Sequence, residues 1–237
     1  MTNSKYKRVL LKLSGEALIG EKGYGIDNTV IEDLASQISL IQKQDIELAI
    51  VLGGGNFFRG SDLVELGIQR VTADHMGMLA TVINSLALQS SLEKNNIPCR
   101  VMSSLSINAV CETYIKRRAD RHLEKGRVVI LASGTGNPFF TTDSAASLRA
   151  IELNAGLMLK GTKVDGIYDS DPIKNSNATI YKNITYKEII EKRLSVMDTT
   201  AVIMCQDHKM PLKVFNVLTP GNLKNVIHDD SIGTIIK

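Results

Sequence analysis

A strand, a glycine-containing loop and a helix follow one another between residues 128 and 153, and this order constrains the fold more than any other stretch. The apolar, β-branched run at 128–131 is typical of a buried strand, and residues 145–153 have the pattern of a helix. The loop between them contains Gly134 and Gly136, and it ends in four residues that favour a helix start: Thr141, Thr142, Asp143 and Ser144. It is therefore either a tight turn with a good helix cap or an anion-binding site at a helix N-terminus.

Apolar runs of strand length recur along the chain and alternate with segments of helical pattern. The predicted strands are residues 9–13, 48–52, 100–102, 157–160, 213–217 and 234–236. The predicted helices start at the capping pair Thr29/Glu32, at 72–74 for a helix to about 94, at about 110 for a helix to 124, at the pair Thr185/Glu188, at Asp198 and at 219–220. Such alternation is typical of an α/β protein, and the even composition over residues 1–237 favours a single domain.

Two segments have more specific expectations. The long helix is expected to bury a face of apolar residues at helical spacing, namely Met76, Leu79, Ile83, Leu86 and Leu92. Residues 168–183 are rich in Asp, Asn, Ser and Pro, and we expect them to form a long functional loop.

The composition limits the classes of function. Apolar residues make up 43% of the 237 residues, which is typical of an ordered globular protein. Lys and Arg exceed Asp and Glu by three (28 against 25) and are scattered, so no nucleic-acid partner is expected. The first apolar run is too short for a secretory or membrane segment, which favours a cytoplasmic protein with no membrane partner. Cysteines and histidines show no metal-ligand spacing, and we expect reduced, buried thiols.

Lys12 and Lys160 are the most informative charged residues. Each closes an apolar run just before a glycine-containing turn, and a lysine within a buried parallel strand is costly unless an anion meets it. In a parallel sheet both would lie at the carboxyl edge, where open α/β sheets bind ligands. The alternative is that each lysine reaches solvent from its strand end, but two such residues on separate strands favour a phosphate site.

Other residues indicate the same chemistry. The glycine run 53–55 exceeds what a turn needs, which suggests that a ligand approaches the backbone. Arg59 is either a phosphate donor or an ordinary surface residue, and Asp74 either complements a helix dipole or accepts hydrogen bonds from a sugar. The chain has no Walker-type phosphate loop, and Phe139 stands where a dinucleotide fingerprint has its third glycine. The remaining features predict polyphosphate binding and phosphoryl transfer.

Five motifs, which span essentially the whole chain, resemble in content and order those of the bacterial uridylate kinases, a family of the amino acid kinase superfamily. They are Lys12-Leu13-Ser14-Gly15, Gly53-Gly54-Gly55-Asn56-x-x-Arg59-Gly60, Asp74-His75-Met76-Gly77-Met78, Gly134-Thr135-Gly136-Asn137-Pro138-Phe139-Phe140-Thr141-Thr142-Asp143 and Thr162-Lys163-Val164-Asp165-Gly166. The third and fourth motifs are specific to the uridylate branch, whereas the lysine and glycine-run motifs belong to the wider superfamily. Gly161 departs from the family pattern, which has alanine there.

The resemblance implies a three-layer αβα sandwich with a mainly parallel central sheet. It implies transfer of the γ-phosphoryl group of ATP to UMP with Mg²⁺, whose ligands it leaves open, and it places most of the UMP site in the N-terminal part and most of the ATP site in the C-terminal part. The residues implied for catalysis are Lys12 and Lys160, which neutralise the migrating phosphoryl group, Asp143, which orients them, and Arg59. Those implied for ATP are Lys12, Leu13, Ser14, Gly15, Gly55, Arg59, Thr162, Tyr168 and Asp171. Those implied for UMP are Gly54, Asp74, Thr135, Gly136, Asn137, Pro138, Phe139, Phe140, Thr141 and Thr142.

The resemblance also implies a homohexamer that GTP activates and UTP inhibits. Its GTP-responsive loop aligns with Gly20, Glu21, Lys22, Gly23, Tyr24 and Gly25. Two alternatives stay open: another superfamily kinase, acting on carbamate, acetylglutamate or aspartate, or a non-catalytic nucleotide sensor or storage protein on the same scaffold. The first would leave the Asp74 motif without a purpose, and the presence of both lysines with Asp143 disfavours the second.

Overall fold

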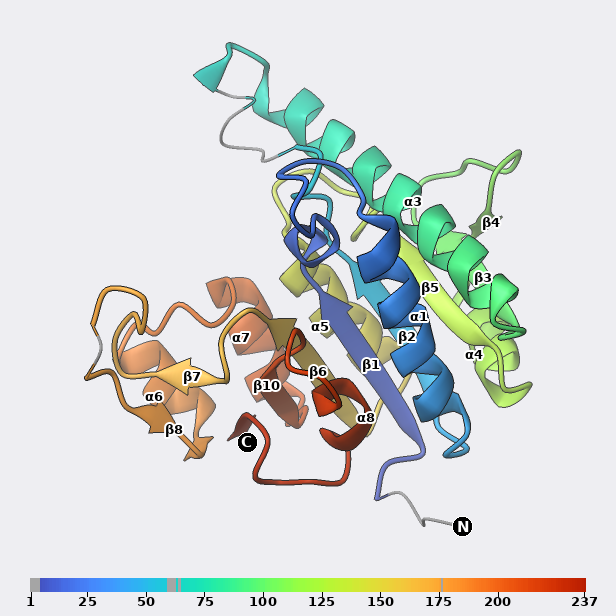
Figure 1. Cartoon of the computed structure of the whole chain (residues 1–237). Helices are drawn as coiled ribbons and strands as arrows, with labels where there is room; N and C mark the ends of the chain where they lie inside the picture. Colours follow the sequence, from blue (N-terminus) through green and yellow to red (C-terminus); the bar gives the residue numbers. More distant parts are fainter. Residues whose placement is uncertain (1–4, 59–62, 64, 176) are drawn as a thin grey trace.

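A central sheet organises the molecule (Figure 1). The computed structural model describes residues 5–58, 63, 65–175 and 177–237. Within this part of the chain, nine strands form one sheet in the order β4-β3-β5-β2-β1-β6-β10-β11-β9, and every neighbouring pair is parallel except β10 and β11. The strands are β1 (Arg8–Leu13), β2 (Glu47–Leu52), β3 (Cys99–Ser103), β4 (Glu112–Thr113), β5 (Val128–Ala132), β6 (Leu157–Thr162), β9 (Asn183–Ile184), β10 (Leu212–Asn216) and β11 (Thr234–Ile236). The predicted α/β class with a mainly parallel sheet is confirmed.

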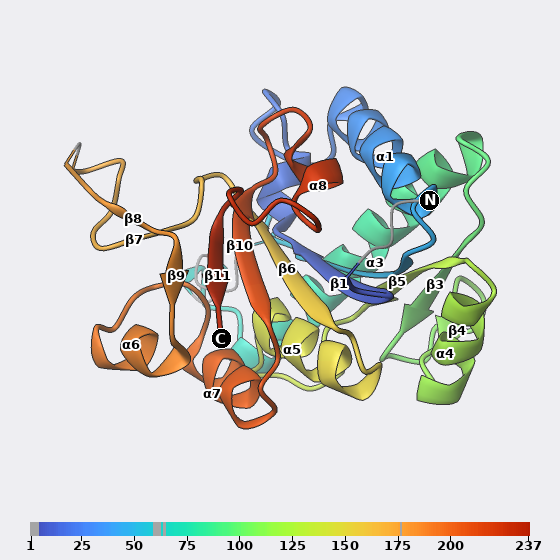
Figure 2. The same cartoon turned by 90° about the horizontal axis from the view of Figure 1, so that it is seen from below.

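Helices cover both faces of the sheet. The helical elements are η1 (Gly15–Leu18), α1 (Asn28–Gln42), α3 (Arg70–Lys94), α4 (Lys116–Glu124), α5 (Thr142–Glu152), α6 (Tyr186–Glu191), α7 (Thr199–Asp207) and α8 (Asn222–Asn225). One core joins the sheet to α1, α3 and α8, and a second joins it to α4, α5, α6 and α7. Figure 2 shows α1 and α8 on one side of the sheet and α4, α5 and α7 on the other. The expected three-layer αβα arrangement is therefore present.

Successive side chains of a strand point to opposite faces of the sheet, and this alternation decides where Lys12 of β1 points. Val9, Leu11 and Leu13 pack in the core on the α1 face, and Leu10 packs in the core on the α5 face. Lys12 falls on the same face as Leu10, so its side chain is directed toward α5. Strand alternation thus aims a lysine at the helix that follows the glycine loop.

Two predicted helix starts agree with the structure and two do not. Asp198 caps α7, and Thr185 and Glu188 form the predicted capping box at α6. The predicted pair Thr29/Glu32 is wrong, because Asp27 caps α1 by accepting the Thr29 N–H at 2.8 Å. Helix α3 begins at Arg70, two residues before the predicted start.

Three segments near the sheet edges were predicted incorrectly. Residues 112–113 pair with β3 as an edge strand, so the helix expected from about 110 begins only at Lys116. Residues 168–183 are not one loop, because β7 (Ile167–Tyr168) and β8 (Ile180–Tyr181) form an antiparallel ribbon and β9 follows. The final helix is a short element, and it starts after Gly221 instead of at 219–220.

The buried face of α3 agrees with the expectation only in part, since Leu92 is buried and Leu86 packs against the core as predicted. Leu79 and Ile83 are each 48% exposed, although their spacing placed them in the core. Beside apolar residues such as Val82 and Leu88, the buried residues of α3 include several small and polar ones: Ala73, Ala80, Thr81, Asn84 and Ser85. Asn84 explains the choice, because its amide donates to the Gly53 carbonyl at 2.7 Å and to Asn56 Oδ1 at 2.7 Å. The helix therefore anchors the glycine loop with polar groups and leaves a large apolar pair outside.

Two expected properties can be compared directly with the described residues. In this part of the chain, no helix is both long and apolar enough to span a bilayer. The three cysteines are free, as expected, and Cys99 and Cys205 are buried, whereas Cys111 is only half-buried.

Candidate active site

Two lysines and one aspartate meet at the carboxyl edge of the sheet. Lys12 of β1 and Lys160 of β6 are direct register partners on adjacent parallel strands. Lys12 Nζ lies 2.7 Å from Asp143 Oδ1, and Lys160 Nζ lies 2.5 Å from Asp143 Oδ2. Lys160 also donates to the Val196 carbonyl at 2.5 Å. The carboxylate bridges two ammonium groups that would otherwise repel each other at close range.

Asp143 reaches this position because the loop before it starts a helix. Thr141 caps α5, and its hydroxyl accepts the N–H groups of Asp143 and Ser144 at 3.1 and 3.2 Å. Asp143 is the second residue of α5, so the positive end of the helix dipole lies beside its carboxylate. The predicted helix cap is therefore present, and it holds the bridging carboxylate in place, while anion binding at this loop stays a prediction.

The charges of this cluster shift its pKa values. Burial raises the pKa of Asp143, but Lys12 and Lys160 outweigh it through their charges and hydrogen bonds, so the pKa is lowered from 3.8. Burial lowers the pKa of Lys160 from 10.5, and the Asp143 carboxylate opposes this effect. Asp143 is therefore ionised at neutral pH. With both ammonium groups charged, the cluster carries one net positive charge, and this charge favours an anion.

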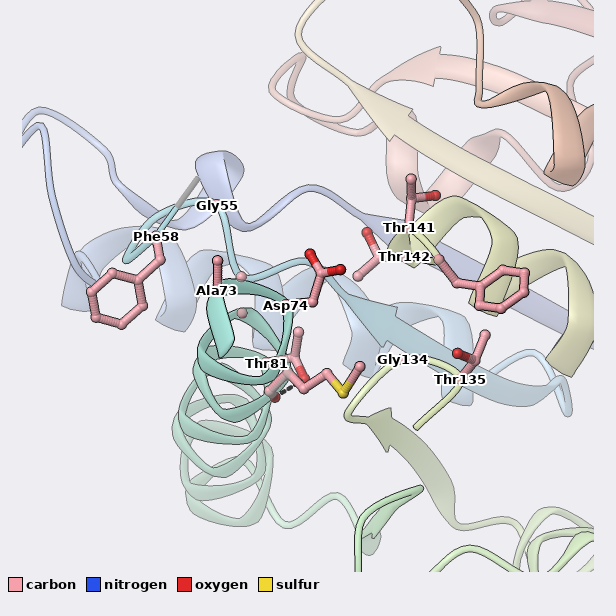
Figure 3. Close-up of a pocket in the computed structure, with 13 residues that line it drawn as sticks. Gly55, Phe58, Ala73, Asp74, Thr81, Gly134, Thr135, Thr141 and Thr142 are labelled. Carbon is pink, nitrogen blue, oxygen red and sulfur yellow. Dashed lines mark hydrogen bonds between the residues drawn. The ribbon is translucent and has the colours of Figure 1, made fainter. Parts of the chain in front are cut away.

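A cavity of about 190 Å³ is lined by Thr141 and Thr142, which directly precede Asp143 in the chain (Figure 3). It lies between the loop after β2, the start of α3 and the loop after β5. The residues that were predicted for UMP or ATP and line it are Gly54, Gly55, Asp74, Thr135, Phe140, Thr141 and Thr142. Gly136, Asn137, Pro138 and Phe139 are not among the lining residues. Gly77, Met78 and Gly134, which belong to the quoted motifs without an assigned role, also line it, as do Phe58, Ala73 and Thr81, which the sequence did not indicate.

Asp74 connects α3 to the loop after β5. Its carboxylate accepts the Phe139 N–H at 2.8 Å and the Arg70 Nε–H at 2.9 and 3.0 Å. Phe139 has a φ of 70°, in the left-handed region, and the Arg70 guanidinium lies 5.8 Å from its ring centroid. Asp74 is the fifth residue of α3 and makes no capping bond, so complementing the helix dipole is not its main role. It holds the loop closed against the cavity.

The glycine run 53–55 has two different causes. A Cβ on Gly53 would lie 2.8 Å from Gly15 N, and one on Gly54 would lie 2.7 Å from the Gly77 carbonyl oxygen. These two glycines are needed because backbone meets backbone. A Cβ on Gly55 would find nothing closer than Glu16 Cγ at 3.7 Å. Gly54 and Gly55 both line the cavity, but only at Gly55 does the protein leave room for a Cβ, so Gly55 is the glycine of this run that the fold itself does not explain.

A second cavity, of about 470 Å³, lies beyond β6. Thr162, Tyr168 and Asp171, which the resemblance assigned to the adenosine end of ATP, all line it. Lys192 and Arg193 line it too, and no sequence pattern pointed to them, because they follow a short helix and adjoin no glycine loop. Val196 belongs to this cavity and binds Lys160, whereas Thr142 belongs to the first cavity and adjoins Asp143. The lysine cluster therefore lies between the two cavities.

The remaining predicted residues line neither cavity or lie outside the described part of the chain. Leu13 is buried at the end of β1, and Ser14 caps η1, whose first residue is Gly15. Gly25, at the end of the predicted regulatory loop 20–25, exchanges two hydrogen bonds with Asn56, at 2.9 and 3.0 Å. Gly161 lies inside β6, not in a turn, and faces Leu13. The prediction for Arg59 concerns a residue outside the described part of the chain.

The donor set gives no preformed cage for a metal ion. Among the described residues, no group of three or more His, Cys, Asp or Glu side chains is placed to hold one. Asp143 is already bound to two lysines, which oppose a cation at that carboxylate. Mg²⁺ in such sites is typically bound to substrate phosphates with few protein ligands, so these residues suit a magnesium–nucleotide complex better than a resident ion.

Comparisons with known proteins show which proteins the chain is similar to. Residues 7–216 match the model of the amino acid kinase family. The chain is 57% identical over 236 residues to a uridylate kinase of Methylococcus capsulatus and 55% identical over 237 residues to one of Xanthomonas campestris pv. campestris, and each alignment covers 100% of this chain and 99% of the relative. Its fold is similar to UMP kinase from Bacillus anthracis (TM-score 0.95, 42% identity, 98% of this chain and 96% of the other). The UMP kinase from Ureaplasma parvum is also similar (TM-score 0.93, 39% identity, 98% and 99%).

Proposed function

The chain belongs to the amino acid kinase family and, within it, to the uridylate kinases, and we propose that it transfers the γ-phosphoryl group of ATP to UMP in a reversible reaction that gives UDP and ADP. The observation that carries this proposal is the pair of register-matched lysines, which share Asp143 and lie between two cavities. Two nucleotides need two cavities, and the group that passes between them is an anion. The proposal places the enzyme in pyrimidine nucleotide biosynthesis.

In the proposed mechanism the lysines act by charge and position. Phosphoryl transfer spreads negative charge over the oxygens of the migrating group, and fixed cations stabilise that charge without covalent chemistry. Each ammonium group has three N–H donors. Lys160 directs two of them at Asp143 and the Val196 carbonyl, so one is left for a phosphoryl oxygen. Asp143 keeps both ammonium groups on the transfer path, and no protein group has to become a nucleophile.

The two substrates are assigned to the two cavities. UMP is proposed for the cavity beside α3, with the Asp74 carboxylate at its ribose and Thr135, Thr141 and Thr142 near its base and phosphate. ATP is proposed to place its phosphates over Ser14, Gly15, Gly55 and Arg59, with Mg²⁺ on those phosphates. Its adenosine end is proposed for the larger cavity, at Thr162, Tyr168 and Asp171. The N-terminal part of a single domain would then hold mainly UMP, and the C-terminal part mainly ATP.

A panel of phosphoryl acceptors tests the proposed function. With ATP as donor, we expect UMP to be phosphorylated well ahead of CMP, AMP, GMP, carbamate, acetylglutamate and aspartate. Formation of UDP and ADP is measured by separating the nucleotides. Preference for any acceptor other than UMP would replace the assignment by another kinase of the superfamily. Tight UMP binding without turnover would favour the sensor or storage alternative.

A pair of glycine variants tests the placement of the phosphates. Because a Cβ on Gly55 has room in the protein, Gly55→Ala should fold normally and keep its Tm. The added methyl group should obstruct the ATP phosphates proposed to lie over Gly55 and raise the KM for ATP about tenfold. Gly54→Ala should instead lower the Tm, since its Cβ meets the Gly77 carbonyl oxygen at 2.7 Å. Thermal unfolding and steady-state kinetics measure both effects. An unchanged KM in Gly55→Ala would remove this glycine from the substrate path.

Regulation and assembly are also part of the proposal. Loop 20–25 is bonded to Asn56, next to Gly55, so a GTP effect at this loop would reach the cavity wall directly. UTP is proposed as the inhibitor. The exposed pair Leu79 and Ile83 on α3 supports association of copies, with a homohexamer as the expected size. A consumer of ATP and UMP is proposed to work in the cytoplasm, where these nucleotides are made.

A further inference from the structure

A buried arginine lies outside all the residues assigned above. Arg149 belongs to α5, six residues after Asp143, and its side chain is only 8% exposed. A guanidinium group rarely loses its contact with water unless its donors are bound. What binds Arg149 therefore indicates what it is for.

Arg149 is the centre of a closed set of contacts. It donates from Nη1 to Glu152 Oε2 at 2.6 Å and from Nη2 to Ser104 Oγ at 2.9 Å. Its guanidinium carbon lies 3.9 Å from the centroid of the Tyr114 ring, and the Tyr114 hydroxyl donates to the same Glu152 oxygen at 2.8 Å. Stacking and two directed donors together hold the planar group in one orientation.

Ser104 connects Arg149 to the wall of the first cavity. Its hydroxyl donates to the Gly134 carbonyl at 2.8 Å, and its own N–H donates to the Ala132 carbonyl at 3.2 Å. A Cβ on Gly136 would lie 3.1 Å from Ser104 Cβ, so the loop after β5 rests directly on this residue. Gly134 and Gly136 both have positive φ, at 56° and 82°, a conformation that needs outside support to stay unique. Gly134 and Thr135 then line the cavity.

We propose that Arg149 is a positioning residue for the acceptor nucleotide: through Ser104 it fixes the Gly134 carbonyl and, with it, the shape of the UMP pocket. This inference rests on the proposed function, because it names the substrate whose binding Arg149 controls. Arginine is required because one planar group has to stack on Tyr114 while aiming two donors at different acceptors. Lysine keeps the charge but has neither the plane nor the fork.

Two variants test this chain of contacts, Arg149→Lys and Ser104→Ala. Each should raise the KM for UMP about tenfold, with the KM for ATP unchanged, because the loop no longer holds one conformation. The KM for UMP of the double variant should exceed that of either single variant by no more than about twofold, because both substitutions break the same series of contacts. The dissociation constant of UMP, measured by calorimetry without ATP, should rise by the same factor as the KM.

Arg8→Lys is the matched control. Arg8 is a similarly enclosed arginine that binds Glu47 and Asp120 at 2.6 and 2.8 Å, but it lies at the amino end of β1, away from both cavities. It should lower the Tm, as Arg149→Lys does, without changing either KM. A general loss of packing would therefore lower the Tm in all variants without a change specific to UMP.

The possible results are distinct. A wild-type protein that neither binds nor phosphorylates UMP contradicts the proposed function. A wild-type protein that does both, together with variants whose KM for UMP is unchanged or rises in parallel with that for ATP, overturns the positioning role alone. If circular dichroism shows that Arg149→Lys is unfolded, Ser104→Ala decides the matter, because it removes one oxygen atom and leaves the arginine in place.

Discussion

Replacing Lys160 by methionine is expected to lower kcat about 10²- to 10³-fold, the usual effect of removing one fixed donor from a developing charge. Methionine has nearly the same length and no charge, so the strand and its neighbours can keep their packing. The dissociation constant of UMP, measured by calorimetry, should stay nearly unchanged, because Lys160 does not line the cavity assigned to UMP. Lys12→Met should behave in the same way, since Lys12 shares the carboxylate.

Lys187→Met provides the control for the loss of a lysine. Lys187 lies on α6, its side chain is 77% exposed, and its Nζ lies 3.7 Å from Glu191 Oε1. Unlike Lys12 and Lys160, it is neither buried nor paired with Asp143. Its kcat should equal that of the wild type. Normal turnover in Lys160→Met or Lys12→Met would remove the proposed catalytic role of that lysine, whatever the acceptor panel shows.

Asp143→Asn should cause the largest loss of stability. The change leaves two buried ammonium groups without their shared carboxylate, and breaking a buried ion pair costs on the order of 3 kcal/mol. For a protein of 237 residues this corresponds to a Tm lowered by about 6–12 °C. Turnover should also fall, because the lysines lose their common anchor. Glu191→Gln, which removes a surface carboxylate, should keep its Tm within about 1 °C.

The effect of Asp143→Asn on stability should depend on pH. The pKa of Asp143 is lowered in the folded state, so its contribution to stability is fully present above its ordinary value of 3.8 and is lost as the pH falls through the folded value. The difference in unfolding free energy between wild type and Asp143→Asn should therefore be constant near neutrality and shrink below about pH 4. Denaturant titrations at several pH values measure it. A difference that grew on acidification would contradict the bridging role.

The sequence predicted the long strands of the sheet and the lysine pair well, for physical reasons, whereas it missed the two-residue strands β4, β7, β8 and β9. Buried parallel strands require continuous apolar runs, so the polar residues that end them are conspicuous, and Lys12 and Lys160 were found in this way. That both end at the same edge follows from parallel pairing. That they are direct neighbours does not, because pairing of β1 with β6 joins segments about 150 residues apart and depends on the whole sheet order.

The missed features depend on tertiary contacts. The outer face of α3 was assigned to the core because Leu79 and Ile83 have the right spacing, but spacing cannot show that Asn84 is drawn inward by the glycine loop. Two of three glycines in that loop exist for contacts with distant backbone at Gly15 and Gly77. Lys192 and Arg193 line a cavity because the segment after α6 lies near Thr162 at the end of β6, 30 residues earlier in the chain. Local patterns contain no information about such partners.

The pairing of β1 with β6 has a further consequence. Neighbouring strands are held about 4.8 Å apart by their ladder of hydrogen bonds, so the spacing of Lys12 and Lys160 is built into the backbone and does not depend on the loops that select substrates. Loop exchange could therefore redirect the protein to a new acceptor while the transfer apparatus stays intact. A single-residue deletion inside either strand would turn one ammonium group to the opposite side of the sheet. Every protein made by such loop exchange would then lose its activity.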